Sequence, residues 1–196
     1  MTRPPDSLNS GYQRFRSKLL EKDMELFESL SDIQSPETMV ITCADSRIDP
    51  NLIFNAAPGE LFVIRNVANI IPSYEISCAS SHCTLAALEY AVKILHVRRI
   101  LVLGHSNCGG VAAALAIGKG QNIEENIVKW VDNLKPACKT VVDVDASQTK
   151  LEKISIQQSL NNLKVYPFVE KAILNSKLSL HGAWFNIEKA NLHWIA

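Results

Sequence analysis

A cysteine, an aspartate and an arginine alternate along a short stretch that ends an apolar run. In the segment TMVITCADSR these residues are Cys43, Asp45 and Arg47. A second apolar run, LVLG, is followed by HSNCGG, which contains His105 and Cys108. Two thiolates and an imidazole suit Zn²⁺, and three protein ligands leave a fourth position open for water. The pattern therefore predicts a zinc site with Cys43, His105 and Cys108 as ligands.

Asp45 and Arg47 have a chemical use beside such a metal. Residues two apart on an extended segment point the same way, so the two side chains can pair. An arginine partner orients a carboxylate and keeps it ionised. An ionised Asp45 can then accept a hydrogen bond from zinc-bound water. Alternatively, Asp45 can bind the metal as a fourth ligand and block the site.

Other functions fit parts of the pattern. The segment GHSNC resembles the G-x-S-x-G turn of serine hydrolases, with His181 or His193 as a late base, but Cys108 stands where that turn has glycine. Cys43 could instead act as a nucleophile whose pKa Arg47 lowers. A third alternative is a zinc-binding protein without catalysis. A measurement of bound metal would distinguish the nucleophilic cysteine from the zinc enzyme.

Composition excludes several broad classes. The chain has 196 residues, with 20 basic and 20 acidic side chains and no net charge. It therefore lacks the excess of positive charge that is typical of nucleic-acid-binding proteins. No apolar run approaches the length of a membrane span. The N-terminal residues lack the apolar segment of a secretory signal. The number of cysteines, five, is odd, which argues against a framework of disulfide bonds. We therefore expect free thiols and a cytoplasmic location.

Apolar runs alternate with helical patterns along the chain. This order predicts an α/β fold with a central, mostly parallel β-sheet flanked by helices, in a single domain over residues 1–196 with an N-terminal helical arm over 1–35. Ligands of such sheets bind at the carboxyl ends of the strands, where Cys43 and His105 stand. The expected strands are 38–42, 60–65, 98–104 and 179–187. The expected helices are 11–30, 85–95, 111–118, 123–134 (stopped near Pro136), 149–165 and 167–175.

Four segments together resemble one known family. The chain resembles the beta-class carbonic anhydrases in the segments CADSR, PGELFVIRNVANIIP, LEYAV and GHSNCGG. The resemblance runs from about Gly11 to Ile187. The resemblance implies a zinc enzyme that hydrates CO2 reversibly to bicarbonate and a proton, by attack of zinc-bound hydroxide. It also implies one zinc per chain on the three ligands named above, with Asp45 and Arg47 as a catalytic pair. A related zinc hydrolase acting on CS2 or COS would use the same residues.

The resemblance extends to the substrate pocket and to assembly. The family lines its substrate pocket at positions that match Gln34, Phe62, Tyr90 and Gly109. Because the family commonly builds this pocket at a dimer interface, the resemblance implies a homodimer or a homotetramer.

Two departures from the family pattern carry further expectations. Gated members bind bicarbonate at a second site made with Trp, Arg and Tyr, but this chain has Val40 and Phe185 at two of these positions and keeps only Arg65. We therefore expect an ungated site, with Asp45 off the metal. The loop over residues 75–84 has Cys and His where the family usually has glycines. This difference indicates a variant loop, or alternatively a second metal site.

Overall fold

The structure is a computed structural model that describes residues 5–22, 24–75, 83–140 and 148–196. The chain divides into two compact units, Met1–Gln34 and Ser35–Ala196. Whether they form one domain with an arm, as the sequence predicts, stays a prediction. Within the described residues, no helix has the length and the hydrophobicity to cross a membrane.

The first unit is helical, but it differs from the expected single helix. It contains α1 (Asp6–Lys22) and α2 (Met24–Ser29). The helix begins earlier than predicted because the Pro5 carbonyl accepts the first helical hydrogen bond, from the amide of Asn9. The carboxylate of Asp6 also lies in the first turn, where it favours a helix start.

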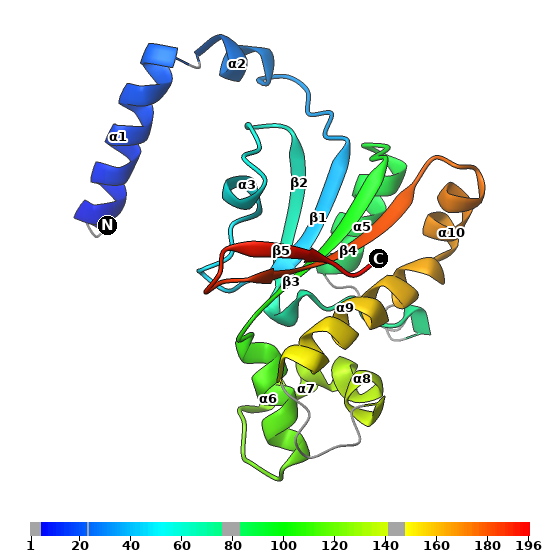
Figure 1. The fold of residues 1–196 in the computed structure, drawn as a ribbon. Helices are drawn as coiled ribbons and strands as arrows, with labels where there is room; N and C mark the ends of the chain where they lie inside the picture. The colour runs from blue at the N-terminus through cyan, green and yellow to red at the C-terminus, as the bar shows by residue number, and fades with distance from the viewer. Residues whose placement is uncertain (1–4, 23, 76–82, 141–147) are drawn as a thin grey trace. The chain divides into compact units, whose positions relative to one another are not determined.

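The second unit is built on a five-stranded sheet in the order β2-β1-β3-β4-β5 (Figure 1). Neighbouring strands are parallel except for the β4–β5 pair, which confirms the predicted fold class. The strands are β1 (Thr38–Cys43), β2 (Leu61–Asn66), β3 (Arg99–His105), β4 (Ser179–Asn186) and β5 (Asn191–Trp194). β5 was not predicted, because this four-residue edge strand is mostly exposed and has no apolar run.

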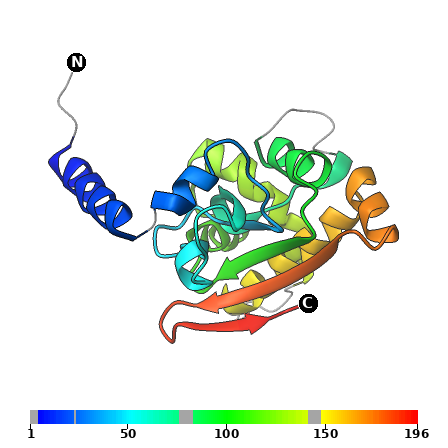
Figure 2. The same cartoon turned by 90° about the horizontal axis from the view of Figure 1, so that it is seen from above.

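One face of the sheet is covered by three helices, α5 (Cys83–Lys93), α9 (Gln148–Lys164) and α10 (Pro167–Leu174) (Figure 2). Met39, Ile41, Ile100 and Val102 point from β1 and β3 into this layer and form its core with side chains of the helices. On the opposite face, Val40, Leu101 and Ala183 form a smaller cluster. The short α3 (Pro50–Ile53) packs there through Ile53. Both faces of the central strands are thus buried, which explains their continuous apolar sequences.

The carboxyl ends of the strands lead into a third layer. It consists of the 3-10 turn η1 (Val67–Asn69), α6 (Gly109–Gly118), α7 (Glu125–Val131), η2 (Asp132–Leu134) and α8 (Lys135–Thr140). Figure 1 shows α6, α7 and α8 grouped at this end of the sheet. Cys43 and Cys108 belong to the apolar core of this layer. The predicted zinc ligands therefore lie where the strand ends meet the helical layer.

Most predicted elements are confirmed to within a few residues. The predicted helix over 123–134 corresponds to α7 and η2, which end before Pro136 as expected. The sequence did not indicate α8, in whose first turn Pro136 lies; a helix tolerates proline there because that position needs no amide hydrogen bond. The predicted irregular segment 66–82 contains η1, and its residues 76–82, with Cys78 and His82, lie outside the described residues.

Candidate metal centre

Cys43 is the last residue of β1, and its side chain is 3 % exposed. Its Sγ accepts a hydrogen bond of 3.3 Å from the backbone amide of Ala68. Ala68 has a φ of 64°, in the left-handed region, which turns the chain sharply after β2. The turn therefore directs a backbone donor at a sulfur that carries negative charge when it binds a metal.

His105 ends β3, and Cys108 precedes α6 after a tight turn in which Asn107 has a φ of 56°. The turn is held to the sheet because the amide of Ser106 donates to the carbonyl of Phe185 on β4. The Ser106 hydroxyl accepts a hydrogen bond from the amide of Ile187. Ser106 is buried and has this structural partner, so the arrangement does not favour the serine-hydrolase alternative.

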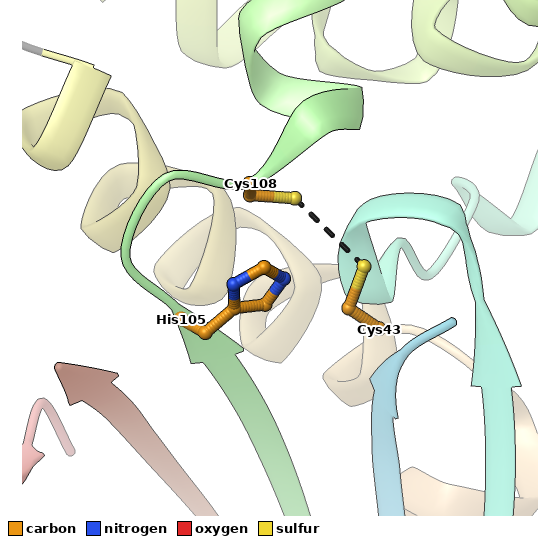
Figure 3. A group of neighbouring side chains, drawn as sticks. All are labelled: Cys43, His105 and Cys108. Atoms are coloured by element: carbon orange, nitrogen blue, oxygen red, sulfur yellow. Dashed lines mark hydrogen bonds between the residues drawn. The ribbon is translucent and has the colours of Figure 1, made fainter. Parts of the chain in front are cut away.

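The three predicted ligands converge from two strand ends and one helix start (Figure 3). Their ligand atoms all lie within 4.8 Å of one another, and all three residues are buried. Cys43 Sγ and Cys108 Sγ are 3.8 Å apart. Two Zn–S bonds of about 2.3 Å at a tetrahedral angle place sulfurs about 3.8 Å apart, so the spacing fits zinc.

The imidazole of His105 is also prepared for a metal. Its Nδ1 donates to the carbonyl of Ser106 at 2.9 Å, which leaves the lone pair on Nε2. Nε2 is fully buried, and it has no hydrogen-bond partner among the described residues. A buried nitrogen without a partner is costly, and a metal ion at this position would satisfy it.

The hydrogen bond between the two thiols shifts their pKa values in opposite directions. The hydrogen bond from Cys108 lowers the pKa of Cys43, although burial opposes this shift. The same hydrogen bond to Cys43, together with burial, raises the pKa of Cys108. One sulfur is thus readily a thiolate, and a cation is needed to make both sulfurs thiolates.

Asp45 and Arg47 form the predicted pair. Arg47 Nε donates to Asp45 Oδ1 at 2.9 Å, and Arg47 Nη2 donates to Asp45 Oδ2 at 2.7 Å. These hydrogen bonds hold the pKa of Asp45 well below its usual range, so the carboxylate is ionised at neutral pH. Arg47 Nη2 also donates to the carbonyl of Asn107, which ties the pair to the turn between His105 and Cys108. Asp45 Oδ2 lies 3.9 Å from His105 Nε2.

Arg65 supports the same segment from β2. Its Nε donates to the carbonyl of Cys43 at 3.0 Å, and its Nη2 donates to the carbonyls of Asp45 and Ile48. The guanidinium thus holds the backbone on both sides of Asp45.

Two of the predicted pocket residues, Phe62 and Tyr90, are in contact. The rings of Phe62 and Tyr90 stack with their centroids 6.0 Å apart and an angle of 24° between the planes. Tyr90 is 43 % exposed. Gly109 is the first residue of α6, and Gln34 is the last residue of the N-terminal unit. Their roles in a substrate pocket stay predictions.

Comparison with known proteins decides the family. The family model described as carbonic anhydrase matches residues 38–192. The chain belongs to the carbonic anhydrase family. Beta carbonic anhydrase 3 of Arabidopsis thaliana is 37 % identical over 194 residues, which cover 94 % of this chain and 74 % of that protein. A carbonic anhydrase of Synechocystis sp. is 35 % identical over 192 residues, which cover 94 % of this chain and 69 % of the relative.

Solved structures give the same result. The beta-carbonic anhydrase CcaA is 34 % identical, with a TM-score of 0.88 over 96 % of this chain and 93 % of that one. The predicted membership of the beta class, and with it a zinc cofactor and a carbonic anhydrase enzyme, is thereby confirmed. The comparisons give no support to CS2 or COS as alternative substrates. The matched residues span 61 % to 74 % of the length of four such curated relatives.

One buried residue at the centre was missed by the sequence analysis. Glu152 on α9 is 2 % exposed and accepts a hydrogen bond from the backbone amide of Cys108. The sequence places Glu152 on the same face of the predicted helix as the apolar Ile156, which is a signal for burial but not for the contact with Cys108. A charged residue on the buried face of a helix needs a partner, and here the partner is a predicted metal ligand.

Proposed function

We propose that this chain catalyses the reversible hydration of CO2 to bicarbonate and a proton, with one Zn²⁺ bound by Cys43, His105 and Cys108. The observation that carries the proposal is the carboxylate of Asp45, which Arg47 holds 3.9 Å from the unpartnered Nε2 of His105. Bound zinc supplies a Lewis acid that makes hydroxide available from water near neutral pH.

Asp45 orients the nucleophile in this mechanism. Because its pKa is lowered, the carboxylate is an acceptor only, and it takes the hydrogen bond of the nucleophilic oxygen. A lone pair of that oxygen then faces the carbon of CO2. Arg47 does not react, but its two hydrogen bonds fix the plane of the carboxylate and prevent its rotation.

We propose further that the site is ungated, with Asp45 off the metal in the resting enzyme. Both oxygens of Asp45 are engaged by Arg47, and coordination of zinc would disrupt at least part of this pairing. Arg65 is occupied with three backbone carbonyls rather than with an anion. These contacts support a carboxylate that stays available to the substrate.

The substrate pocket is proposed to include Gln34, Phe62, Tyr90 and Gly109. CO2 is uncharged and has no strong hydrogen-bond donors or acceptors, so an apolar wall suits it. The stacked rings of Phe62 and Tyr90 form an apolar surface of this kind, which supports the proposal. Substitution of Phe62 by alanine should raise KM more than it lowers kcat, since the ring makes contact without taking part in proton transfer.

We propose a homodimer or a homotetramer as the working assembly. Two tetrameric beta-carbonic anhydrases of Sordaria macrospora are described, and a structure from that work is 28 % identical to this chain, with a TM-score of 0.81 over 97 % of this chain and 95 % of the other. The N-terminal unit exposes Leu8, Tyr12 and Phe15, which a partner subunit would bury. Light scattering coupled to size-exclusion chromatography tests this proposal, and a monomer at working concentration would contradict it.

The proposed location is the cytoplasm, where free thiols persist. Relatives in Arabidopsis thaliana include proteins named as chloroplastic and mitochondrial. Fractionation of the source cells with detection of the native chain tests the location, and recovery in an organelle would contradict it.

The deciding experiment measures zinc content and CO2 hydration by stopped flow on one preparation. We expect one zinc per chain and rapid hydration, lost in Asp45→Ala while zinc is retained. Asp132→Ala is the matched control, since this aspartate pairs with Lys135 on the surface. Zinc without hydration would overturn the proposed substrate, and absence of zinc would overturn the metal site.

A further inference from the structure

Glu152 presents a buried carboxylate to the residue that supplies the last metal ligand. Its Oε1 accepts hydrogen bonds from the Cys108 amide at 3.0 Å and from Gln148 Nε2 at 3.1 Å. Its Oε2 accepts from Trp184 Nε1 at 2.9 Å. Both oxygens are therefore engaged, and the carboxylate is fixed from α9, from β4 and from the turn before α6.

The burial of this charge needs an explanation. Glu152 is 2 % exposed, and within the described residues no lysine or arginine forms a salt bridge with it. Burying an ionised carboxylate is costly unless hydrogen bonds compensate. The partners of Glu152 offer N–H donors, which match a carboxylate that only accepts. The site is thus built for a carboxylate rather than for an apolar or amide side chain.

Gln148 completes the arrangement one helical turn before Glu152. Its Nε2 donates to the carbonyl of Cys108 at 2.9 Å as well as to Glu152. Two side chains of α9 thus contact both polar groups of the Cys108 backbone. The position of Cys108 Sγ, 3.8 Å from Cys43 Sγ, depends on that backbone.

We infer that Glu152 is a positioning residue of the zinc site, which acts through Cys108 and does not touch the metal or the substrate. It holds the Cys108 backbone so that Sγ meets Cys43 and His105 before the metal arrives. The inference rests on the proposed function, because it assumes that these three residues bind zinc. Partners that orient metal ligands typically change metal affinity or activity by about 10- to 100-fold when they are replaced.

The test compares Glu152→Gln with wild type and with Ser159→Ala. Ser159 lies on the same helix, is equally buried, accepts from the Ile71 amide and donates to the Asn69 carbonyl. The control therefore removes buried hydrogen bonds of α9 without contact to Cys108. The amide of Glu152→Gln keeps the shape of the side chain but turns one acceptor into a donor that faces an N–H group.

Three readouts are measured on each protein. They are zinc affinity by competition with a chelator, the thiolate-to-metal absorption of the Co²⁺-substituted protein, and thermal stability. We expect zinc affinity about 10- to 100-fold lower in Glu152→Gln, with an altered Co²⁺ spectrum. Ser159→Ala should lose stability but keep both metal readouts. If the glutamine variant fails to fold, the same readouts are measured on Gln148→Ala. This variant removes the contact with the Cys108 carbonyl, and because Gln148 is only half-buried its loss disturbs the fold less.

The outcomes separate the inference from the proposed function. Zinc affinity and Co²⁺ spectrum equal to wild type in Glu152→Gln would overturn the positioning role while the proposed function stands. Equal losses of metal affinity in Glu152→Gln and Ser159→Ala would also overturn it, since a general loss of stability would then explain both. A wild-type chain that binds no zinc would overturn the proposed function itself.

Discussion

The guanidinium of Arg47 binds both oxygens of Asp45, at 2.9 and 2.7 Å, and the same guanidinium contacts the Asn107 carbonyl at 3.1 Å. The carboxylate is thus tied to the turn that carries two of the proposed metal ligands, His105 and Cys108. Because the carboxylate and the metal site share this turn, the position of Asp45 relative to His105 is set by Arg47 and not by Asp45 alone.

We expect Arg47→Ala to lower kcat for CO2 hydration by about tenfold or more, while zinc content stays at one per chain. The side chain of Asp45 loses its two fixed hydrogen bonds and can rotate or approach the metal. Stopped-flow hydration and metal analysis on the same sample measure both effects. Arg99→Ala is the control, because Arg99 pairs with Glu37 at the other end of β3. Full activity of Arg47→Ala would show that Asp45 needs no partner.

The lowered pKa of Asp45 predicts how the pair affects stability. The hydrogen bonds of Arg47 place the folded-state pKa below the ordinary value of 3.8. The ionised carboxylate therefore stabilises the folded chain above about pH 4, and this contribution is lost as pH falls through the folded-state pKa. We expect Asp45→Asn to unfold more easily than wild type near neutral pH.

Urea unfolding at a series of pH values, with chelator in every sample, measures this difference. The gap in free energy of unfolding between wild type and Asp45→Asn should close as the pH drops below about 4. A gap that widens toward acid would mean that the folded state raises the pKa of Asp45, contrary to the observed contacts.

Sequence reasoning predicted that Cys43 and His105 meet, because strand ends are visible in the sequence. The apolar runs end where β1 ends at Cys43 and β3 ends at His105. In a parallel sheet these ends meet at one edge, so residues far apart in the chain can be brought together by topology alone. The Asp45–Arg47 pair is local, and its spacing on an extended segment was enough to predict it.

The contacts that hold these residues in place could not be predicted from the sequence. Glu152 reaches Cys108 from 44 residues away, and Trp184 reaches Glu152 from β4. Such contacts depend on the angle and register at which α9 packs on the sheet, and no local pattern encodes them. Likewise, the turn at Ala68 that donates to Cys43 Sγ has no glycine to mark its positive φ.

The close approach of α6 to η1 predicts a sensitive glycine. A Cβ on Gly110 would lie 2.6 Å from Val67 Cγ1 and 2.9 Å from Ala68 Cβ. We expect Gly110→Ala to destabilise the protein by about 1–3 kcal/mol, because the added methyl overpacks a buried contact. The shift should also move the Ala68 amide away from Cys43 Sγ and weaken zinc binding.

Gly118→Ala is the matched control on the same helix, because no atom lies within 4 Å of its added Cβ. It should be neutral or stabilise the chain by up to about 1 kcal/mol. Thermal unfolding and chelator competition on both variants measure the two effects. Equal stability of the two variants would mean that α6 and η1 are not in close contact.

Removal of zinc should destabilise the folded chain, because it leaves the buried Nε2 of His105 without a partner and removes the cation that stabilises the neighbouring Cys43 and Cys108 as thiolates. A ligand that binds only the folded state raises its stability by mass action. We therefore expect a chelator to lower the melting temperature and added Zn²⁺ to restore it.

Cys138→Ser is the control, since this thiol lies on α8 and is not part of the Cys43–His105–Cys108 group. The variant should keep both the zinc content and the response of the melting temperature to the chelator. A melting temperature that does not respond to the chelator, in a protein shown to have lost its zinc, would mean that the three ligands are held together by the fold without any help from the metal.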